Sequence, residues 1–424
     1  MAIAYSLISD LPKPLQGADF FADALLPALE RAFHSEFDAR MLRVGKGESQ
    51  AGDELYVISH PTASALTFTL SDTQVLVDNR TSSTGPGYHA AEIDALDQIA
   101  NELGLAWRES DEHHDESGYF ANRDFAALQS AHAGFLRSLL NALVFDNDDV
   151  RRTRLTMNVD ALVPTDFFVA SPMGLWEQDD IQRMQHADEG AFLRFASRWF
   201  PWWERERDER YWSNVARCVC WVDLPWHPPE HQLHLHHYQM AKTALERAGQ
   251  TDTLEYRDII TLLSDDCPAD WTPAPEGMGF RRGMVCWGEA DGWSLNVPGY
   301  WREEGVDGDQ IRFVHGERSI EFRLRQFDGL NQSDLGKELE LLLESCELDE
   351  PHYAAVEKMQ AFTLCEGSVS GKGRIYWRSA DEGRNRMRAF LVAGTSIAWI
   401  EIEWLGKEHR DWAEAQLKAF SRKA

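Results

Sequence analysis

The sequence predicts an α+β fold in which two parts rich in short strands flank a mainly helical middle. Runs of Val, Ile, Thr and Phe separated by polar turns recur in the first and last parts, as expected for strands. Apolar residues in the middle recur instead at the helical period, and a Pro-rich stretch at 267–276 ends it. With 424 residues, two or three domains are expected. We predict an α+β domain over 1–150, a helical Trp-rich segment over 151–272 packed on it, and an α+β domain over 278–424.

The first segment has the pattern of a small sheet with helices, a mixed α/β unit. In some stretches its apolar residues recur at helical spacing, and in others they form short runs rich in Val, Ile, Thr and Phe. A turn-rich loop from Asn79 to His89 precedes a helix, and its two glycines, Gly85 and Gly87, favour a tight turn over a phosphate cradle because no P-loop lysine follows. The expected elements are a helix at 18–36, strands at 54–59, 65–70, 74–78 and 105–109, and helices at 90–103 and 124–143.

The middle segment is dense in tryptophan. Seven of the 16 tryptophans fall between Trp176 and Trp226. Phe192, Phe195 and Trp199 follow the helical period, which favours a Trp-rich helical core. The alternative is an aromatic surface for a partner, because tryptophan is a common interface anchor.

The last segment has the pattern of an antiparallel sheet that carries two helices. Alternation of apolar and polar residues is clear toward the end of 397–404, as in a strand with one buried face. The expected strands are 293–297, 311–315, 319–327, 356–365, 368–377, 386–392 and 396–404, and the expected helices are 334–346 and 408–420.

The opening of this segment, Gly-Trp-Ser-Leu-Asn-Val-Pro-Gly-Tyr-Trp ending at Trp301, and a final helix with Trp412, Leu417 and Phe420 resemble the α/β/α-type sandwich domains typified by DcrB and PsbP. The resemblance covers about 145 residues. It implies a protein-binding or adaptor role and carries over no catalytic residue. Such domains also occur as chaperones and accessory proteins beside bacterial type VI secretion effectors. The first two thirds, with their Asp-Asn-Arg…Gly-Pro-Gly-Tyr-His loop, resemble a bacterial family of unassigned chemistry. The whole chain is similar to an immunity protein that guards against a secreted toxin.

Negative charge is concentrated in two stretches of the chain. The formal net charge is −28, and residues 51–150 hold 17 acids against 4 bases while residues 251–350 hold 23 against 9. Charge held in blocks creates a directional field that steers a basic partner. Solubility is the alternative account. The same excess argues against binding to nucleic acid or anionic lipid, so we expect a basic protein partner, such as a toxin or effector domain.

Two acidic clusters are the expected contact residues for that partner. The first lies in an acidic loop that lacks the alternating oxygen ligands of a calcium loop. The second follows the Tyr-Trp pair that opens the last segment. The predicted contacts are Asp111, Glu112, Asp115 and Glu116 in the first cluster, and Glu303, Glu304, Asp307 and Asp309 in the second.

Five histidines between His227 and His237 are the most suggestive group for metal chemistry. His227, His231 and His234 would share one face of a helix, and two such histidines can ligate zinc. However, Pro228 and Pro229 place the group at a helix start, and the H-E-x-x-H spacing is missing. We therefore predict surface or interface histidines without a metal.

The sequence contains no recognisable catalytic set, so we expect a non-enzymatic protein without a cofactor. Six cysteines without a CxxC pair fit free thiols in a reducing cytoplasm. No apolar run approaches the roughly 18 residues that span a bilayer. The main hypothesis is neutralisation of a toxin, such as a type VI secretion nuclease effector, by occlusion of its basic active site. One alternative is an effector-loading chaperone or adaptor, and a second is a metal-dependent hydrolase that uses the histidines of 227–237.

Overall fold

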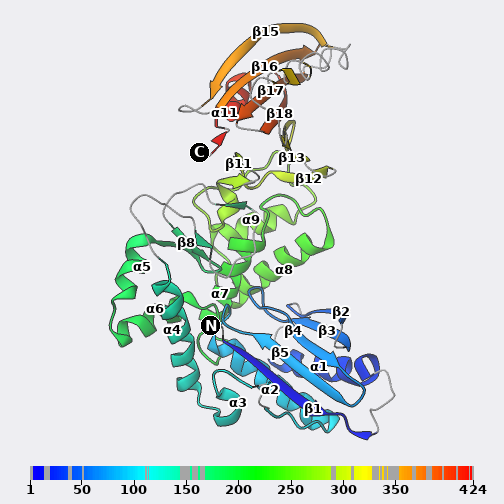
Figure 1. Cartoon of the computed structure of the whole chain (residues 1–424), viewed down its shortest axis with the longest axis vertical. Helices are drawn as coiled ribbons and strands as arrows, with labels where there is room; N and C mark the ends of the chain where they lie inside the picture. Colours follow the sequence, from blue (N-terminus) through cyan, green and yellow to red (C-terminus); the bar gives the residue numbers. More distant parts are fainter. Residues whose placement is uncertain are drawn as a thin grey trace. The chain divides into compact units, whose positions relative to one another are not determined.

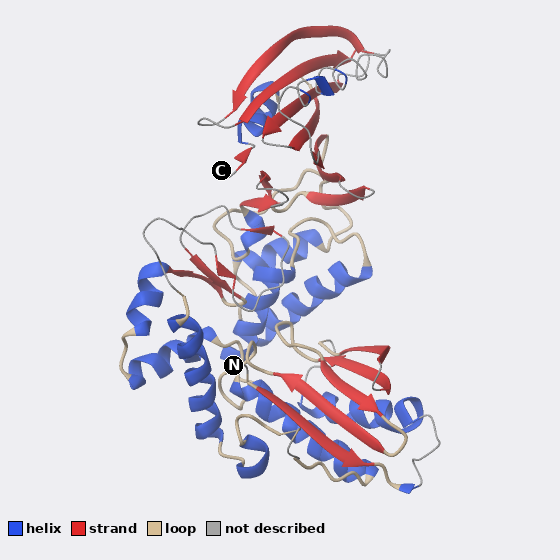
Figure 2. Ribbon diagram, in the orientation of Figure 1, coloured by secondary structure: helices blue, strands red, loops and turns tan. Residues whose placement is uncertain are grey.

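The chain forms two compact units in a computed structural model (Figures 1 and 2). Unit 1 comprises Met1–Asn158, Thr165–Leu224 and Glu230–Ile260, and unit 2 comprises Val159–Pro164, Pro225–Pro229 and Thr261–Ala424. The structure describes residues 3–13, 20–36, 41–49, 52–109, 112, 114–143, 153–154, 161–162, 168–287, 293–306, 310–326, 334, 337–338, 341, 353–364, 369–378, 384–393, 396–406, 409–419 and 421–422.

Unit 1 is built on a five-stranded antiparallel sheet with the strand order β1-β5-β4-β3-β2. Side chains on one face of β1 are buried, Tyr5 and Leu7 among them, as expected where successive side chains point to opposite faces. Figure 2 shows α1 and α2 running behind this sheet. The elements are β1 (Ala4–Asp10), a π-helical turn (Phe20–Leu25), α1 (Leu26–Glu36), β2 (Arg43–Ser49), β3 (Gly52–Ile58), β4 (Leu66–Leu70), β5 (Gln74–Arg80) and α2 (Pro86–Leu103).

The remainder of unit 1 is mainly helical. Asp124, Asp188 and Asp208 are the N-caps of α4, α6 and α7, where each carboxylate accepts a hydrogen bond from a backbone N–H of the first turn. The elements are α3 (Tyr119–Asn122), α4 (Phe125–Asn141), β6 (Thr153–Arg154), β8 (Phe168–Ser171), β9 (Gly174–Glu177), α5 (Gln178–Gln185), α6 (Glu189–Trp199), α7 (Glu209–Cys218), a π-helical turn (Val219–Asp223), α8 (Gln232–Arg247) and α9 (Leu254–Leu262), whose last two residues belong to unit 2.

The tryptophans of the middle segment form a core, which confirms the preferred prediction over an aromatic surface. Five of the seven are buried: Trp199, Trp202, Trp203, Trp212 and Trp226. The other two, Trp176 and Trp221, are partly buried. Trp176 stacks on Trp199 at a ring separation of 5.2 Å. Burial of such large rings is a major source of stability.

Unit 2 contains a seven-stranded antiparallel sheet in the order β12-β13-β14-β18-β17-β16-β15. Trp301, before β12, stacks on Trp412 of α11 with ring centroids 5.6 Å apart. Most of the helix predicted at 334–346 lies outside the described residues. The elements are β7 (Ala161–Leu162), a 3-10 turn (Phe280–Arg282), β10 (Met284–Trp287), β11 (Trp293–Pro298), β12 (Arg302–Val306), β13 (Gln310–His315), β14 (Arg318–Gln326), β15 (Tyr353–Leu364), β16 (Val369–Arg378), β17 (Arg384–Ala393), β18 (Ser396–Leu405), α11 (Arg410–Ala419) and β19 (Ser421–Arg422).

The α+β class is therefore confirmed, with one predicted strand in error. Residues 105–109 make only one isolated bridge, between Arg108 and Ile8 of β1. Hydrogen bonds link these two residues in both directions at 3.0 Å, but no ladder extends from them. The sequence also left several strands unpredicted: β1, β2, β8, β9, β10 and β12, and the two-residue strands β7 and β19.

Candidate functional site

The described part of the acidic loop, which we define as residues 109–118, lies along the free edge of β1. The N–H of Ser6 donates to the carbonyl of His114 at 3.1 Å, and the N–H of Glu116 donates to the carbonyl of Ala4 at 3.1 Å. Glu112 and Glu116 are exposed. Backbone pairing to a sheet edge thus holds the acidic loop at His114 and Glu116, and the carboxylates of Glu112 and Glu116 are in solvent.

The prediction that Asp115 contacts a partner is wrong, because its side chain is buried. Its carboxylate accepts hydrogen bonds from the N–H of Phe120 and the hydroxyl of Ser117, both at 2.7 Å. Nε2 of His89, itself fully buried, lies 3.4 Å from Oδ2 of Asp115. Burial alone would raise the pKa of Asp115, but His89 and these donors outweigh it and hold the pKa well below its usual range. Asp115 therefore anchors the acidic loop from within.

A second buried carboxylate, Glu92, lies one helical turn beyond His89 on α2. Nδ2 of Asn79 donates to both of its oxygens, at 2.8 and 2.9 Å, and the hydroxyl of Tyr5 donates at 2.9 Å. Tyr88 also forms a hydrogen bond with the Glu92 carboxylate. Desolvation raises the pKa of Glu92 to about 7 despite these donors, which lower it. No sequence pattern singles out Glu92, since a glutamate on a helix is usually exposed.

The Gly85–Gly87 turn packs against the Trp-rich segment. The N–H of Gly87 donates to the carbonyl of Trp202 at 3.0 Å. A Cβ on Gly87 would lie 2.1 Å from the carbonyl oxygen of Glu204, so only glycine fits there. Gly85 has a φ of 118°, which favours glycine as well. As predicted, the turn delivers Tyr88 and His89 to a helix start, and α2 begins with Pro86.

Two residues of the second acidic cluster, Glu303 and Glu304, lie in β12. Glu303 is exposed and Glu304 is half-buried, and Glu304 forms ion pairs with Arg302 and, at 3.8 Å, with Arg312. A carboxylate paired within its own sheet offers less charge to a partner. The predicted contacts Asp111, Asp307 and Asp309 lie outside the described residues.

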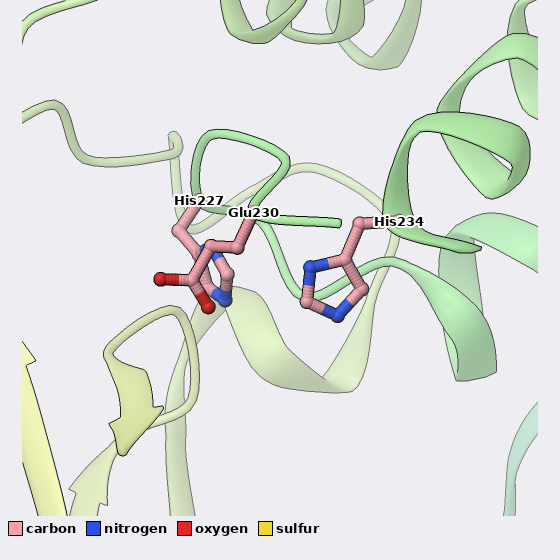
Figure 3. Close-up of side chains that lie close together, drawn as sticks. All are labelled: His227, Glu230 and His234. Carbon is pink, nitrogen blue, oxygen red and sulfur yellow. The ribbon is translucent and has the colours of Figure 1, made fainter. Parts of the chain in front are cut away.

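Three residues of the histidine-rich segment converge: His227, Glu230 and His234 (Figure 3). One ligand atom from each lies within 4.8 Å of the other two. Figure 3 shows the Glu230 carboxylate beside the His227 ring, with the His234 ring facing both from the start of α8. His227 is buried, His234 is half-buried and Glu230 is exposed. Two imidazoles and a carboxylate are a ligand set that zinc uses in proteins.

The other three histidines of the segment have separate surroundings. His231 caps α8, with its Nδ1 accepting from the N–H of His234 at 3.3 Å. This confirms that the segment lies at a helix start. Burial lowers the pKa of His237 to about 4, with a smaller contribution from the nearby Arg43, and it also lowers the pKa of His236.

Comparisons with known proteins show only a loose likeness. No family model and no curated protein matches this chain. Among solved structures, PsbP from the cyanobacterium Synechocystis sp. PCC 6803 aligns with a TM-score of 0.28 and 9% identity, over 33% of this chain and 93% of PsbP. The Ran-binding protein Mog1p of Saccharomyces cerevisiae aligns with a TM-score of 0.21 and 17% identity, over 30% of this chain and 78% of Mog1p. At such TM-scores these likenesses carry no conclusion about function.

Among the described residues, no helix combines the length and the apolar character needed to cross a membrane.

Proposed function

We propose that this chain is a non-enzymatic binding protein whose acidic loop receives a basic protein partner. The proposal rests on the contrast between one buried carboxylate and two exposed carboxylates in that loop. Asp115 is buried and anchored to His89, while Glu112 and Glu116 point into solvent. Anchoring the loop at Asp115 reduces the ordering cost of presenting the neighbouring charge to a partner.

Glu112 and Glu116 differ from Asp115 in having no basic partner among the described residues of unit 1. Two arginines of unit 1 have other carboxylate partners: Arg108 pairs with Asp10 at 3.1 Å, and Arg123 pairs with Asp97 at 2.9 Å. In the part of the chain that the structure describes, no ion pair joins Glu112 or Glu116 to a basic side chain. These carboxylates are therefore available to a cation on another molecule.

In its narrower form, the proposal is that the partner is a toxin domain and that the chain acts as a bacterial immunity protein in the cytoplasm. A nuclease toxin, including one delivered by type VI secretion, needs a basic groove to bind phosphates. Exposed carboxylates beside an anchored segment of chain can compete for such a groove. The acidic charge and the sequence resemblance described above support this form.

The adaptor alternative needs an exposed apolar groove for a hydrophobic segment. Among the described residues, five large apolar side chains are exposed: Val44, Leu233, Ile260, Met284 and Leu341. The first four lie on four different elements, so no single element presents an apolar stripe of the kind that an adaptor needs.

Charge reversal of the acidic loop tests the proposal. Capture on the immobilised chain supplies the partner, which is then purified and titrated against wild type and Glu112→Lys/Glu116→Lys at several salt concentrations. We expect affinity to fall with rising salt and association to slow about tenfold or more in the variant, since steering contributes 10-fold to 1,000-fold.

Asp53→Lys/Asp72→Lys is the matched control. It makes the same change of charge on two exposed residues near the turn between β4 and β5. The carbonyl of Thr73, in this turn, accepts a hydrogen bond from the N–H of Leu11, just past the end of β1, whereas Asp115 pairs with Tyr5 near the start of β1. The control turn and the acidic loop therefore lie about 20 Å apart along the strand. Equal binding by both double variants would contradict the proposed surface.

A further inference from the structure

We propose that His227, Glu230 and His234 form a binding site for a divalent transition-metal ion, with Zn²⁺ as the best-suited ion. Imidazole nitrogen suits zinc and its transition-metal neighbours, whereas Mg²⁺ and Ca²⁺ prefer sites made of oxygen ligands alone. This site is independent of the acidic loop, and neither proposal requires the other.

The spacing of the three side chains fits one ion after small side-chain adjustments. Ligand atoms on a tetrahedral zinc ion lie about 3.4 Å apart, given bonds of about 2.0–2.1 Å. The observed separations are within 4.8 Å, so closing on the ion requires movements that side-chain rotation can supply. The three residues fall within eight consecutive positions, and the local course of the chain sets their arrangement.

Hydrogen bonding already prepares His227 as a ligand. Its Nδ1 lies 2.8 Å from the carbonyl oxygen of Pro228. A carbonyl can only accept, so Nδ1 carries the proton and the lone pair resides on Nε2. Metal-bound histidines usually donate their other N–H to such an acceptor, which fixes the tautomer and the ring orientation.

His231 helps to orient His234 without belonging to the cluster. The two rings have centroids 3.6 Å apart, and Nδ1 of His231 accepts from the N–H of His234 at 3.3 Å. Because Nδ1 of His231 caps the helix through the N–H of His234, we assign to His231 the role of positioning His234. The positive end of the α8 dipole weakly opposes a cation, and the negative charge of Glu230 offsets this.

The backbone that carries the cluster is held in an uncommon conformation. Trp226 precedes His227 and has a φ of 56°, which is rare for a bulky residue and tends to persist where the surroundings enforce it. The Trp226 ring is fully buried, with the guanidinium of Arg282 3.5 Å from its centroid. Pro228 and Pro229 fix two further φ angles. These constraints reduce the number of backbone conformations open to the segment that carries the cluster.

Three protein ligands leave a further coordination position on zinc. Sites of this type hold a water or another ligand there. Glu230 is exposed, so that position is accessible to water or to a side chain from another molecule.

Metal titration of the purified full-length chain tests the site. Calorimetry with ZnCl₂, after dialysis against chelator, should show one ion per chain, and Co²⁺ should give the visible absorption of a low-coordinate site. Glu230→Gln should lower Zn²⁺ affinity by about 100-fold or more, because the loss of even an outer-shell partner typically costs 10–100-fold. Since Glu230 is exposed, this variant should fold, whereas His227→Ala removes a buried side chain.

His236→Ala is the control, because it removes a neighbouring histidine of α8 that is not part of the cluster. Its Zn²⁺ affinity should stay within about threefold of wild type, well short of the loss expected for an outer-shell partner. Absence of stoichiometric binding would overturn the inference. Binding that survives in Glu230→Gln, or that is lost equally in His236→Ala, would also overturn it, since either result describes adventitious binding to surface histidines.

Discussion

The buried Glu92 should make unit 1 less stable as pH rises from about 4.5 to about 7. The pKa of Glu92 is about 7 in the folded protein, against an ordinary value of 4.5. Between these values the folded protein holds a proton that the unfolded chain has released, so the free energy of unfolding falls with rising pH. A difference of 2.5 at 1.36 kcal/mol per pKa unit corresponds to about 3 kcal/mol, lost mostly between pH 4.5 and about 7.

Glu92→Gln isolates this contribution. The carboxamide has nearly the same volume and stays neutral at every pH. It presents an N–H₂ where Asn79 and Tyr5 now donate, which adds a destabilisation of about 1–3 kcal/mol that does not vary with pH. Other titrating groups are common to both proteins, so the difference between them reports on Glu92.

The assay is amide hydrogen exchange along α2 from pH 4.5 to 8, corrected for intrinsic rates. A local readout is preferable because a two-unit chain need not unfold in one step. The stability of wild type relative to Glu92→Gln should fall by about 3 kcal/mol across this range. A constant difference, or one that grows with pH, would refute the reasoning, because it would mean that the four hydrogen bonds outweigh burial and keep Glu92 ionised.

Three further substitutions test other parts of the structure. Asp115→Ala leaves the buried His89 without its partner, and should destabilise unit 1 by about 3 kcal/mol and speed amide exchange in the acidic loop. Gly87→Ala places a Cβ 2.2 Å from Cδ1 of Trp202, and should lower the melting temperature through a cost of about 1–3 kcal/mol. Asp208→Ala removes the cap of α7, whose carboxylate accepts a hydrogen bond at 2.9 Å, and should cost about 1 kcal/mol in urea unfolding.

Sequence patterns predicted the elements whose signal is local. Alternation and helical period predicted ten of the antiparallel strands and helices α2, α4 and α11. The ten strands are β3, β4, β5, β11, β13, β14, β15, β16, β17 and β18. Strand β2 was missed because Arg43–Ser49 contains two glycines and few apolar residues, so it has little intrinsic strand signal. Strand β2 forms because β3 supplies backbone hydrogen-bonding partners, and the residues of β2 by themselves do not indicate this pairing.

The candidate sites were less predictable because they depend on contacts between distant residues. Asp115 and Glu116 are neighbours of the same charge, yet one is buried against His89 and the other is exposed. No local pattern distinguishes them. At the histidine cluster the sequence identified His227 and His234, but it favoured His231 over Glu230, since a helical spacing was assumed for a segment that becomes helical only at Gln232.

The footprint of the partner on this chain tests the central proposal most directly. Hydrogen exchange measured on the purified complex and on the free chain locates the amides that the partner protects. The proposed binding surface predicts slower exchange in the acidic loop around Glu112 and Glu116 upon binding, with the turn at Asp72 unchanged. Protection confined to other elements, with the acidic loop exchanging as in the free chain, would contradict it.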